Sequence, residues 1–317
     1  MRIVTCYPLG SAHLAAIERC GPDLVVVDAG QERIAEELLS ADIYCGHAKV
    51  PVPWERVVAN GRLRWIQSSA AGIDHCLVPT VILSTILVTS AAGLFAPQVA
   101  EQTLALLLGI VRRLPDFIRA GEKKSFVRLP TDDLRGKWVG IVGFGGNGQR
   151  IAKVLQPLET RTIAFELLWE NALKPPEIES LLPVERLDAI LPVLDVVILC
   201  VPLTPRTKGL FNGERFANMK EGAILINVAR GEVVVEADLV HALRTGRLAA
   251  AGLDVTEVEP LSATSPLWEF PNVVITPHVG AQSFDRIDRT TEFFCDNLRR
   301  FLAGRPLRNL VDKGRGF

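Results

Sequence analysis

Short apolar runs alternate with helix-like segments along almost the whole chain, and this alternation constrains the fold more than any other feature. Strands that alternate with helices are typical of parallel α/β sheets. The sequence therefore predicts two doubly wound α/β lobes. The first series of runs covers residues 2–6, 24–27, 43–45, 65–68 and 86–89, and the second covers residues 138–142, 162–165, 196–201, 223–227, 252–255 and 273–276.

The six runs of the second series match a complete doubly wound dinucleotide-binding domain. A long apolar helix is expected at residues 97–113, because Pro97 suits a first turn and Pro115 would end the helix. A final helix is expected at residues 286–302. A length of 317 residues suits two domains, and we expect one hinge near Pro97 and another near Ser283.

Charge and cysteine usage narrow the classes of function. Lys and Arg number 35 and Asp and Glu 36, so the chain lacks the basic footprint of a nucleic-acid-binding protein. Four arginines within residues 298–308 are interpreted as a solvated helix face. The longest apolar stretch, residues 81–96, is shorter than the roughly 20 residues of a membrane span. We expect neither a nucleic-acid nor a membrane partner.

The cysteines show no CxxC spacing, which argues against a zinc site or a disulfide framework. Scattered cysteines favour a reducing compartment, so we expect a cytoplasmic protein without a metal. The six are Cys6, Cys20, Cys45, Cys76, Cys200 and Cys295.

The most informative local motif is a glycine loop between a strand and a helix, Gly143-Phe-Gly145-Gly-Asn-Gly148. In a dinucleotide-binding loop, the first glycine permits a tight turn, the second lets the backbone approach a pyrophosphate, and the third allows close helix–strand packing. The helix expected at residues 149–155 then directs its N-terminus at the anion. Gly146 and Asn147 are also expected at the cofactor, although Asn147 is explained equally well as decoration of the helix start.

An acidic residue follows at the position of a ribose-binding group. Glu166 comes directly after the run at residues 162–165. An acid there accepts hydrogen bonds from the adenosine ribose and repels a 2′-phosphate, which favours NAD over NADP. Leu167 and Leu168 come next, so no adjacent arginine favours NADP. The glycine loop alone is also typical of flavin enzymes and methyltransferases, or of a plain turn beside a surface Glu.

Four polar residues lie near the ends of predicted strands of the second series, at the edge where doubly wound folds bind ligands. Arg230, Asp254 and His278 each lie at or just after the end of one run, and Glu259 lies five residues beyond Asp254. Taken singly, each is explained equally well as a capping or surface residue. Together, in this chain order, they indicate a catalytic site.

At these residues the chain resembles the D-isomer-specific 2-hydroxyacid dehydrogenases, over nearly its whole length. The resemblance implies a flavodoxin-like substrate (catalytic) domain of residues 1–96 and 285–317, with a Rossmann NAD-binding domain of residues 97–284 inserted into it. It also implies a homodimer, built by the region 97–134. Besides the glycine loop, the matching motifs are Trp65-Ile-Gln-Ser-Ser-Ala-Ala-Gly-Ile-Asp74, Val99-Ala-Glu101, Val201-Pro-Leu-Thr-Pro205, Asn227-Val-Ala-Arg-Gly231, Gly252-Leu-Asp-Val-Thr-Glu-Val-Glu-Pro260 and Thr276-Pro-His278.

The resemblance also implies roles for individual residues. Arg230, Glu259 and His278 would be catalytic, and Asp254 would hold the nicotinamide carboxamide. The substrate would be bound by Arg230, by His278 and by the backbone N–H groups of two residues of the other lobe, Ala71 and Gly72. The cofactor would be lined by Val201, Pro202, Ala229, Arg230 and His278.

These residue types suit hydride transfer between a 2-keto acid and a D-2-hydroxy acid. Arg230 offers a planar fork for the substrate carboxylate. His278 donates a proton to the carbonyl oxygen and removes it in the reverse reaction, with Glu259 to orient it; the next candidates for that donor are His75 and His47. We expect an NAD(H)-dependent oxidoreductase, and an NADH-sensing regulatory protein on the same fold is the alternative.

Several positions depart from the family pattern. Gln102 stands where many relatives have His, and Val235 stands where an Asp is common. Residues 123–126 lack a family-typical Trp, which leaves the distal side of the substrate pocket open. Two positions separate the chain from neighbouring activities: formate dehydrogenases lack the acid that Glu259 provides, and phosphite dehydrogenases carry a Lys where Ala71 stands.

Overall fold

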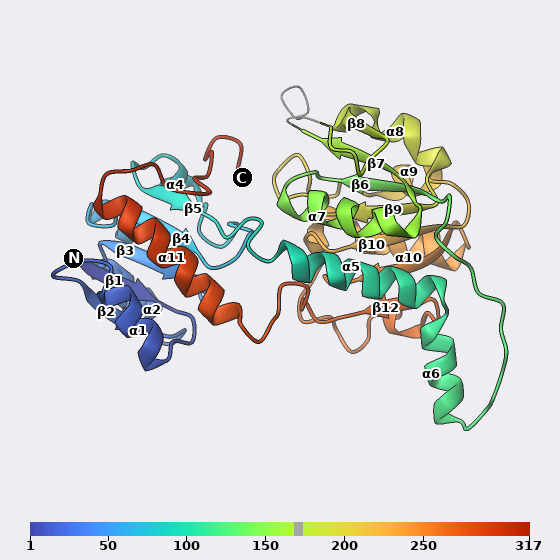
Figure 1. The fold of residues 1–317 in the computed structure, drawn as a ribbon, viewed down its shortest axis with the longest axis horizontal. Helices are drawn as coiled ribbons and strands as arrows, with labels where there is room; N and C mark the ends of the chain where they lie inside the picture. Colours follow the sequence, from blue (N-terminus) through green and yellow to red (C-terminus); the bar gives the residue numbers. More distant parts are fainter. Residues whose placement is uncertain (168–173) are drawn as a thin grey trace. The chain divides into compact units, whose positions relative to one another are not determined.

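The computed structural model describes residues 1–167 and 174–317 and divides into two compact units (Figure 1). Unit 1 comprises Met1–Leu94 and Ser283–Phe317, and unit 2 comprises Phe95–Gln282. The chain thus leaves unit 1 once and returns to it once. Our sequence prediction placed these two crossings after residues 96 and 284, two residues later in each case.

Unit 1 is built on a five-stranded parallel sheet with the order β2-β1-β3-β4-β5. This is the order of flavodoxin-like doubly wound sheets, so the predicted fold class is confirmed for this unit. Each predicted run lies within two residues of a strand. The strands are β1 (Arg2–Thr5), β2 (Val25–Asp28), β3 (Ile43–Gly46), β4 (Trp65–Ser68) and β5 (Leu87–Thr89).

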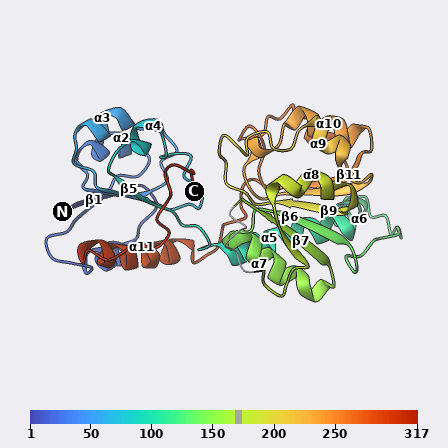
Figure 2. The same ribbon diagram turned by 90° about the horizontal axis from the view of Figure 1, so that it is seen from above.

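Helices cover both faces of this sheet (Figure 2). Alternate strand residues point to opposite faces, so Ile3 and Trp65 pack with α1 and α11, while Val4 and Ile66 pack with α2, α3 and α4. The helices are α1 (Ser11–Glu18), α2 (Ile34–Glu37), α3 (Trp54–Ala59), α4 (Pro79–Ile82) and α11 (Arg286–Leu302).

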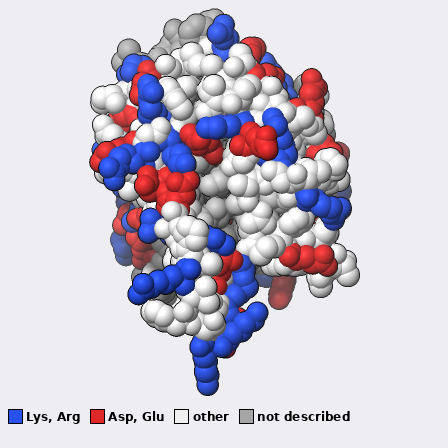
Figure 3. All heavy atoms as spheres, turned by 90° about the vertical axis from the view of Figure 1, so that its right-hand side faces the viewer, with Lys and Arg blue, Asp and Glu red and all other residues white. Residues whose placement is uncertain are grey.

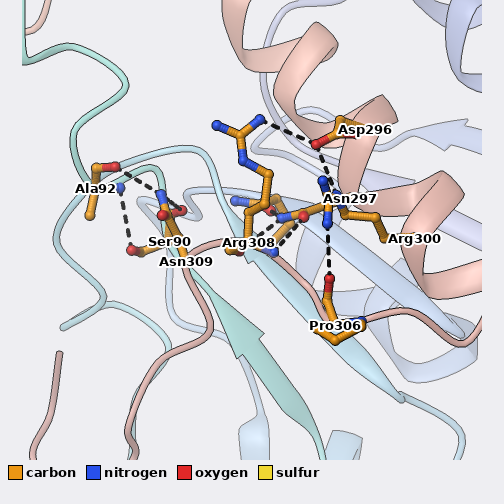
Figure 4. Close-up of polar contacts among 9 residues, drawn as sticks. Ser90, Ala92, Asp296, Asn297, Arg300, Pro306, Arg308 and Asn309 are labelled. Carbon is orange, nitrogen blue, oxygen red and sulfur yellow. Dashed lines mark hydrogen bonds and ion pairs between the residues drawn. The ribbon is translucent and has the colours of Figure 1, made fainter.

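The segment after α11 returns to the edge of the sheet (Figure 4). The buried Asn297 donates to Gln67 Oε1 over 3.0 Å and accepts from the Arg308 backbone N–H over 2.8 Å. Asn309 Nδ2 donates to the carbonyls of Ser90 and Ala92, and Val311 N–H donates to Val88 O over 2.8 Å. These bonds fix the C-terminal segment alongside β5.

The interpretation of four arginines as one solvated helix face holds only in part, because Arg299 and Arg300 lie on α11 whereas Arg305 and Arg308 follow its end. Arg299, Arg305 and Arg308 are exposed. Arg300 and Arg308 both bond Asp296 Oδ2, at 3.1 and 3.2 Å, which neutralises part of their charge (Figure 4). On the face drawn in Figure 3, basic side chains likewise lie beside acidic ones.

Unit 2 contains a seven-stranded parallel sheet with the order β12-β11-β10-β9-β6-β7-β8. Read from β8, this is the Rossmann order with one strand added beyond its sixth, so the predicted fold class is confirmed here as well. The strands are β6 (Trp138–Val142), β7 (Arg161–Glu166), β8 (Ser180–Pro183), β9 (Val196–Leu199), β10 (Ala223–Asn227), β11 (Leu248–Leu253) and β12 (Val273–Ile275).

Two strands of this sheet differ from the sequence prediction. We predicted six strands, and β8 was missed. We also expected β11 to begin at Gly252, whereas it begins at Leu248. Residues 249–251 of this strand are alanines, which have low strand propensity, but parallel pairing with β10 overrides that preference.

The helices of unit 2 also cover both faces of its sheet (Figure 2). Residues of α5 and α7 pack with Val139 and Ile141 on one face, and residues of α8, α9 and α10 pack with Val197 and Leu225 on the other. The helices are α5 (Ala96–Val111), α6 (Leu114–Glu122), α7 (Gly146–Leu155), α8 (Leu187–Ile190), α9 (Gly213–Asn218) and α10 (Glu236–Arg244). No helix of the described residues is both long and apolar enough to cross a membrane.

The expectation that Pro115 only ends a helix was wrong. Arg113 adopts a left-handed conformation, φ +57°, which ends α5, and Pro115 then lies in the first turn of α6. A proline in a first turn loses no intrahelical bond, so it starts the second helix instead of stopping the first.

Candidate active site

The glycine loop connects β6 to α7, and its glycines are required for different reasons. Gly143 has φ +97°, and a Cβ there would lie 2.9 Å from the Cys200 carbonyl group. A Cβ on Gly148 would lie 2.2 Å from Gly143 O. A Cβ on Gly145 would meet nothing within 4 Å, so this glycine borders open space at the start of α7. The loop therefore fits the predicted close approach of a pyrophosphate.

The helix after the loop begins earlier than we expected. α7 starts at Gly146 and not at Gln149, so Gly146, Asn147 and Gly148 form its first turn. The N–H groups of a first turn have no intrahelical partner and favour an anion. The ten-residue helix thus places the predicted cofactor residues of the loop at its N-terminus.

Cys200, which sequence reasoning missed, holds the glycine loop through a hydrogen bond to Gly143. Its thiol donates to Gly143 O over 2.9 Å. Burial and then the charge of Glu166 raise the pKa of the Cys200 thiol, so the thiol stays protonated and keeps its donor. Val201 and Pro202, expected to line the cofactor, follow directly in the chain.

Glu166 is the last residue of β7, and its carboxylate is turned toward the glycine loop. Oε2 accepts from the Phe144 backbone N–H over 2.7 Å, and Oε1 accepts from the Leu167 N–H over 2.8 Å. Two backbone donors therefore fix the position of this charge. Leu168, the other residue used in the NAD argument, lies outside the described residues.

The loop after β10 presents Arg230. Asn227 holds this loop, because its Oδ1 accepts from Ala229 N–H and its Nδ2 donates to Arg230 O, each over 3.1 Å. The Arg230 guanidinium donates to Ala229 O over 2.8 Å. A Cβ on Gly231 would lie only 1.7 Å from Thr256 O, so the Arg230 loop packs directly against the loop after β11.

His278 and Glu259 are brought together as predicted. His278 Nδ1 lies 2.8 Å from Glu259 Oε2, and the two side chains are 44% and 39% exposed. Because an ionised carboxylate only accepts, Nδ1 carries the proton and Nε2 is the nitrogen left to exchange one. Glu259 Oε1 in turn accepts from Thr256 N–H over 3.3 Å.

Asp254 follows β11 and is 4% exposed. Its carboxylate accepts three hydrogen bonds, from the Thr276 hydroxyl at 2.6 Å, Val279 N–H at 3.0 Å and Gly280 N–H at 2.8 Å. Its backbone carbonyl accepts from His278 N–H over 2.8 Å. A carboxylate offers about four acceptor positions, and three of those of Asp254 are used by these bonds. Asp254 therefore anchors the His278 loop.

Ala71 and Gly72 belong to unit 1, in the loop after β4. Ser68 orders this loop, because its Oγ accepts from Ala70 N–H over 3.1 Å and donates to Ala70 O over 2.9 Å. The other two histidines that we named as proton donors also lie in unit 1. The rings of His47 and His75 stack, with centroids 3.9 Å apart. Among the described residues, no three His, Cys, Asp or Glu side chains converge as metal ligands.

Comparison with known proteins decides the family. The family model described as "D-isomer specific 2-hydroxyacid dehydrogenase, NAD binding domain" matches residues 104–280. The chain belongs to the D-isomer specific 2-hydroxyacid dehydrogenases. A hydroxypyruvate reductase from Blautia hydrogenotrophica is 33% identical, with 97% of each chain covered. The predicted family resemblance is thereby confirmed, and the chain is an oxidoreductase that uses a nicotinamide dinucleotide.

Two solved structures of this family are similar over the full length. A D-isomer specific 2-hydroxyacid dehydrogenase from Xanthobacter autotrophicus, in complex with NADPH and MES, has a TM-score of 0.84 at 29% identity and covers 100% of this chain and 99% of its own. An NADPH-dependent glyoxylate/hydroxypyruvate reductase from Sinorhizobium meliloti, in complex with NADP and sulfate, has a TM-score of 0.84 at 27% identity with the same coverage. The choice between NAD and NADP is therefore a separate question for this chain.

Proposed function

We propose that this 2-hydroxyacid dehydrogenase is NAD(H)-dependent and interconverts a 2-keto acid and a D-2-hydroxy acid. The observation that carries the proposal is the His278–Glu259 pair, 2.8 Å apart, on the same sheet edge as the Arg230 loop and the glycine loop. A proton-exchanging imidazole and a guanidinium are the two groups that reduction of a keto acid requires.

His278 is the acid and base. Its Nδ1–H is held by Glu259, so in reduction Nε2 donates a proton to the carbonyl oxygen, and in oxidation it accepts the hydroxyl proton. Glu259 fixes the ring and stabilises its cation. When bound, the cofactor's nicotinamide supplies or receives the hydride. The glycine loop and the first turn of α7 would hold the pyrophosphate, and Val201, Pro202, Ala229 and Asp254 would hold the remainder.

Arg230 is the carboxylate clamp. A guanidinium offers two parallel donors to a planar carboxylate, which fixes the keto acid's orientation as well as its charge. The backbone N–H groups of Ala71 and Gly72 would provide the second contact to that carboxylate. Asn227 keeps the Arg230 loop in place through bonds on both sides of the peptide unit that joins Ala229 and Arg230.

NAD(H) is preferred over NADP(H) because of Glu166. Its carboxylate is fixed by two backbone N–H groups and would repel a 2′-phosphate at the adenosine ribose. We expect roughly a 100-fold higher kcat/KM with NADH, since a like-charge contact in a partly desolvated site costs a few kcal/mol. Glu166→Gln should lower the ratio of kcat/KM with NADH to kcat/KM with NADPH. Glu179→Gln, which removes a carboxylate just before β8, should leave that ratio unchanged. Equal kcat/KM with both cofactors in the unaltered protein would refute the preference.

Turnover separates this proposal from the alternative, an NADH-sensing regulatory protein. The experiment is NADH oxidation with a panel of 2-keto acids that includes glyoxylate and hydroxypyruvate. Chiral analysis follows for every product that has a stereocentre at C2, which excludes the glycolate formed from glyoxylate. An enzyme should give D-2-hydroxy acids at rates of order 1 per second or more. A protein that binds NADH but turns over none of the panel would instead be a sensor.

The proposal includes a homodimer built by the region that contains α6. Ile118 on α6 is 63% exposed and Phe126 beyond it is 95% exposed. A cavity of about 570 Å³ at the amino ends of β10, β11 and β12 is lined in part by α5 and α6. Light scattering should give twice 34.7 kDa for the unaltered protein and 34.7 kDa for Phe126→Asp. Leu83→Asp, a control at an 87% exposed residue of unit 1, should leave the mass unchanged. A 34.7 kDa species in the unaltered protein would refute the dimer.

The cytoplasmic location stays a prediction.

A further inference from the structure

Gln102 connects α5 to the loop that carries His278. Gln102 Nε2 lies 2.8 Å from Thr276 Oγ1, and Thr276 Oγ1 lies 2.6 Å from Asp254 Oδ1. The direction of both bonds follows from the chemistry of the groups. An amide nitrogen only donates and an ionised carboxylate only accepts, so the Thr276 hydroxyl accepts from Gln102 and donates to Asp254.

Helix α5, the loop after β11 and the His278 loop also meet at Gly280. A Cβ on this residue would lie 2.7 Å from Asp254 Oδ2 and 3.6 Å from Gln102 Cγ. Gly280 therefore has room only for its own backbone, whose N–H donates to Asp254 over 2.8 Å. The segment from Thr276 to Gly280 is thus bound at both ends, with His278 between them.

His278 needs such support. Its φ of +53° is a left-handed conformation that costs an L residue energy, and it persists only where the surroundings impose it. The bonds from Thr276, Val279 and Gly280 to Asp254 impose it from either side. Of these, only the Thr276 bond involves a side-chain hydroxyl that can rotate away, and Gln102 is the residue that donates to that hydroxyl.

We propose that Gln102 is a positioning residue for His278, which keeps the Thr276 hydroxyl directed at Asp254 and so fixes the His278 loop. The kinetic form of this inference rests on the proposed function, in which His278 exchanges the proton. The structural form does not, because it concerns only the order of the loop.

The first test replaces the amide and keeps the volume. Gln102→Leu should lower kcat for keto acid reduction about tenfold, the scale of one lost hydrogen bond, and leave the Kd for NADH within about twofold. Thr276→Val should have an effect of similar size, Thr276→Ser should restore activity, and the double variant Gln102→Leu/Thr276→Val should be no worse than Thr276→Val alone. Gln98→Leu, the same change one turn earlier on α5, is the matched control. A kcat within twofold of the unaltered protein for Gln102→Leu would overturn the proposal.

The second test uses charge to reverse the bond direction. In Gln102→Glu, an ionised carboxylate only accepts, so it competes with Asp254 for the single Thr276 proton, whereas the protonated carboxyl donates as the amide does. Activity relative to the unaltered protein should therefore rise about five- to tenfold from pH 8 to pH 5. The relative activity of Gln102→Leu should not change with pH. A flat profile for Gln102→Glu would mean that Gln102 acts only through packing.

The third readout requires no turnover. Hydrogen exchange of the Val279 and Gly280 amides, measured on the protein without substrate, should be about tenfold faster in Gln102→Leu and unchanged in Gln98→Leu. If the unaltered protein reduced no keto acid but this difference were seen, the proposed function would be refuted and the positioning role supported. Equal exchange in all three proteins would refute the positioning role whatever the activity.

Discussion

The two units have the same kind of parallel sheet, yet the loops at the carboxyl edges of their strands differ. In unit 2, the strands β10, β11 and β12 are followed by Arg230, Asp254 and His278, which carry charged or titratable side chains. Thr276 bonds the Asp254 carboxylate and Glu259 bonds the His278 ring, whereas Asn227 bonds the backbone carbonyl of Arg230. In unit 1, the loop after β4 contains Ala71 and Gly72, which offer only backbone groups. Under the proposed function, one topology would supply side-chain chemistry from unit 2 and backbone donors from unit 1.

This contrast teaches where substitutions should matter. A side chain that exchanges a proton or pairs with a carboxylate is lost entirely when it is replaced. A backbone N–H survives replacement of its own residue, so its loop is damaged only through the residues that order it.

His278→Ala tests the side-chain half of the contrast most directly. Removal of a general acid should lower kcat for keto acid reduction by about 10²- to 10⁴-fold. The Kd for NADH, measured by fluorescence, should stay within about twofold because the glycine loop is unaltered. If turnover continued at the unaltered rate, the donor would have to be sought among other groups, with His75 and His47 first.

Arg230→Lys keeps the charge and removes the fork. The ammonium cannot form two parallel bonds to a carboxylate, so kcat/KM for the keto acid should fall by roughly 30- to 1000-fold with NADH binding unchanged. Initial rates at a series of keto acid concentrations, with NADH saturating, give this kcat/KM. A variant that kept more than half of the activity would show that the guanidinium has no part in substrate binding.

Glu259→Gln keeps the shape of the His278 partner and removes its charge. The carboxylate 2.8 Å away can only accept from Nδ1 and so leaves Nε2 to exchange the proton, whereas a Gln amide can also donate to Nδ1 and hold the ring in the other tautomer. We expect kcat/KM for reduction to fall about tenfold, the scale of one weakened hydrogen bond. Rates of keto acid reduction and of hydroxy acid oxidation, measured where chemistry limits the rate, check this, and an unchanged rate in both directions would contradict it.

Ser68→Ala tests the backbone half. It removes the hydroxyl that orders the loop of Ala71 and Gly72 but none of the expected donors. The loss should be a net hydrogen bond of about 0.5–1.5 kcal/mol, seen as a KM for keto acid raised about three- to tenfold at nearly constant kcat. A loss of kcat/KM as large as that expected for Arg230→Lys would mean that the backbone donors of unit 1 are as sensitive to substitution as the side chains of unit 2.

Much of the fold was predictable because hydrophobic periodicity is a local signal. The strand runs and the final helix at Arg286–Leu302 follow from it. β8 was missed because Ser180–Pro183 is short and half-buried and ends in a proline, which suits only an edge strand. α6 was missed because Pro115 both follows one helix and begins another.

The candidate site was less accessible to sequence reasoning. Residue types and spacing marked Arg230, Glu259 and His278, since chemistry restricts which side chains can serve. The bond between Gln102 and Thr276 joins residues 174 positions apart, and no local pattern encodes such a contact. From the sequence, Cys200 counts only as one of six scattered cysteines, because its bond to Gly143 depends on two strands that lie side by side.

The discontinuous course of unit 1 determines the order in which the chain is able to fold as it leaves the ribosome. Unit 2 is one continuous stretch, so its sheet is complete before the last 35 residues, Ser283–Phe317, have been made. Unit 1 must wait: until α11 arrives, the sheet face bearing Ile3 and Trp65 lacks Phe294 and Leu298. Nascent chains therefore expose part of an apolar sheet face for the time needed to synthesise unit 2, about 10–40 seconds at 5–20 residues per second.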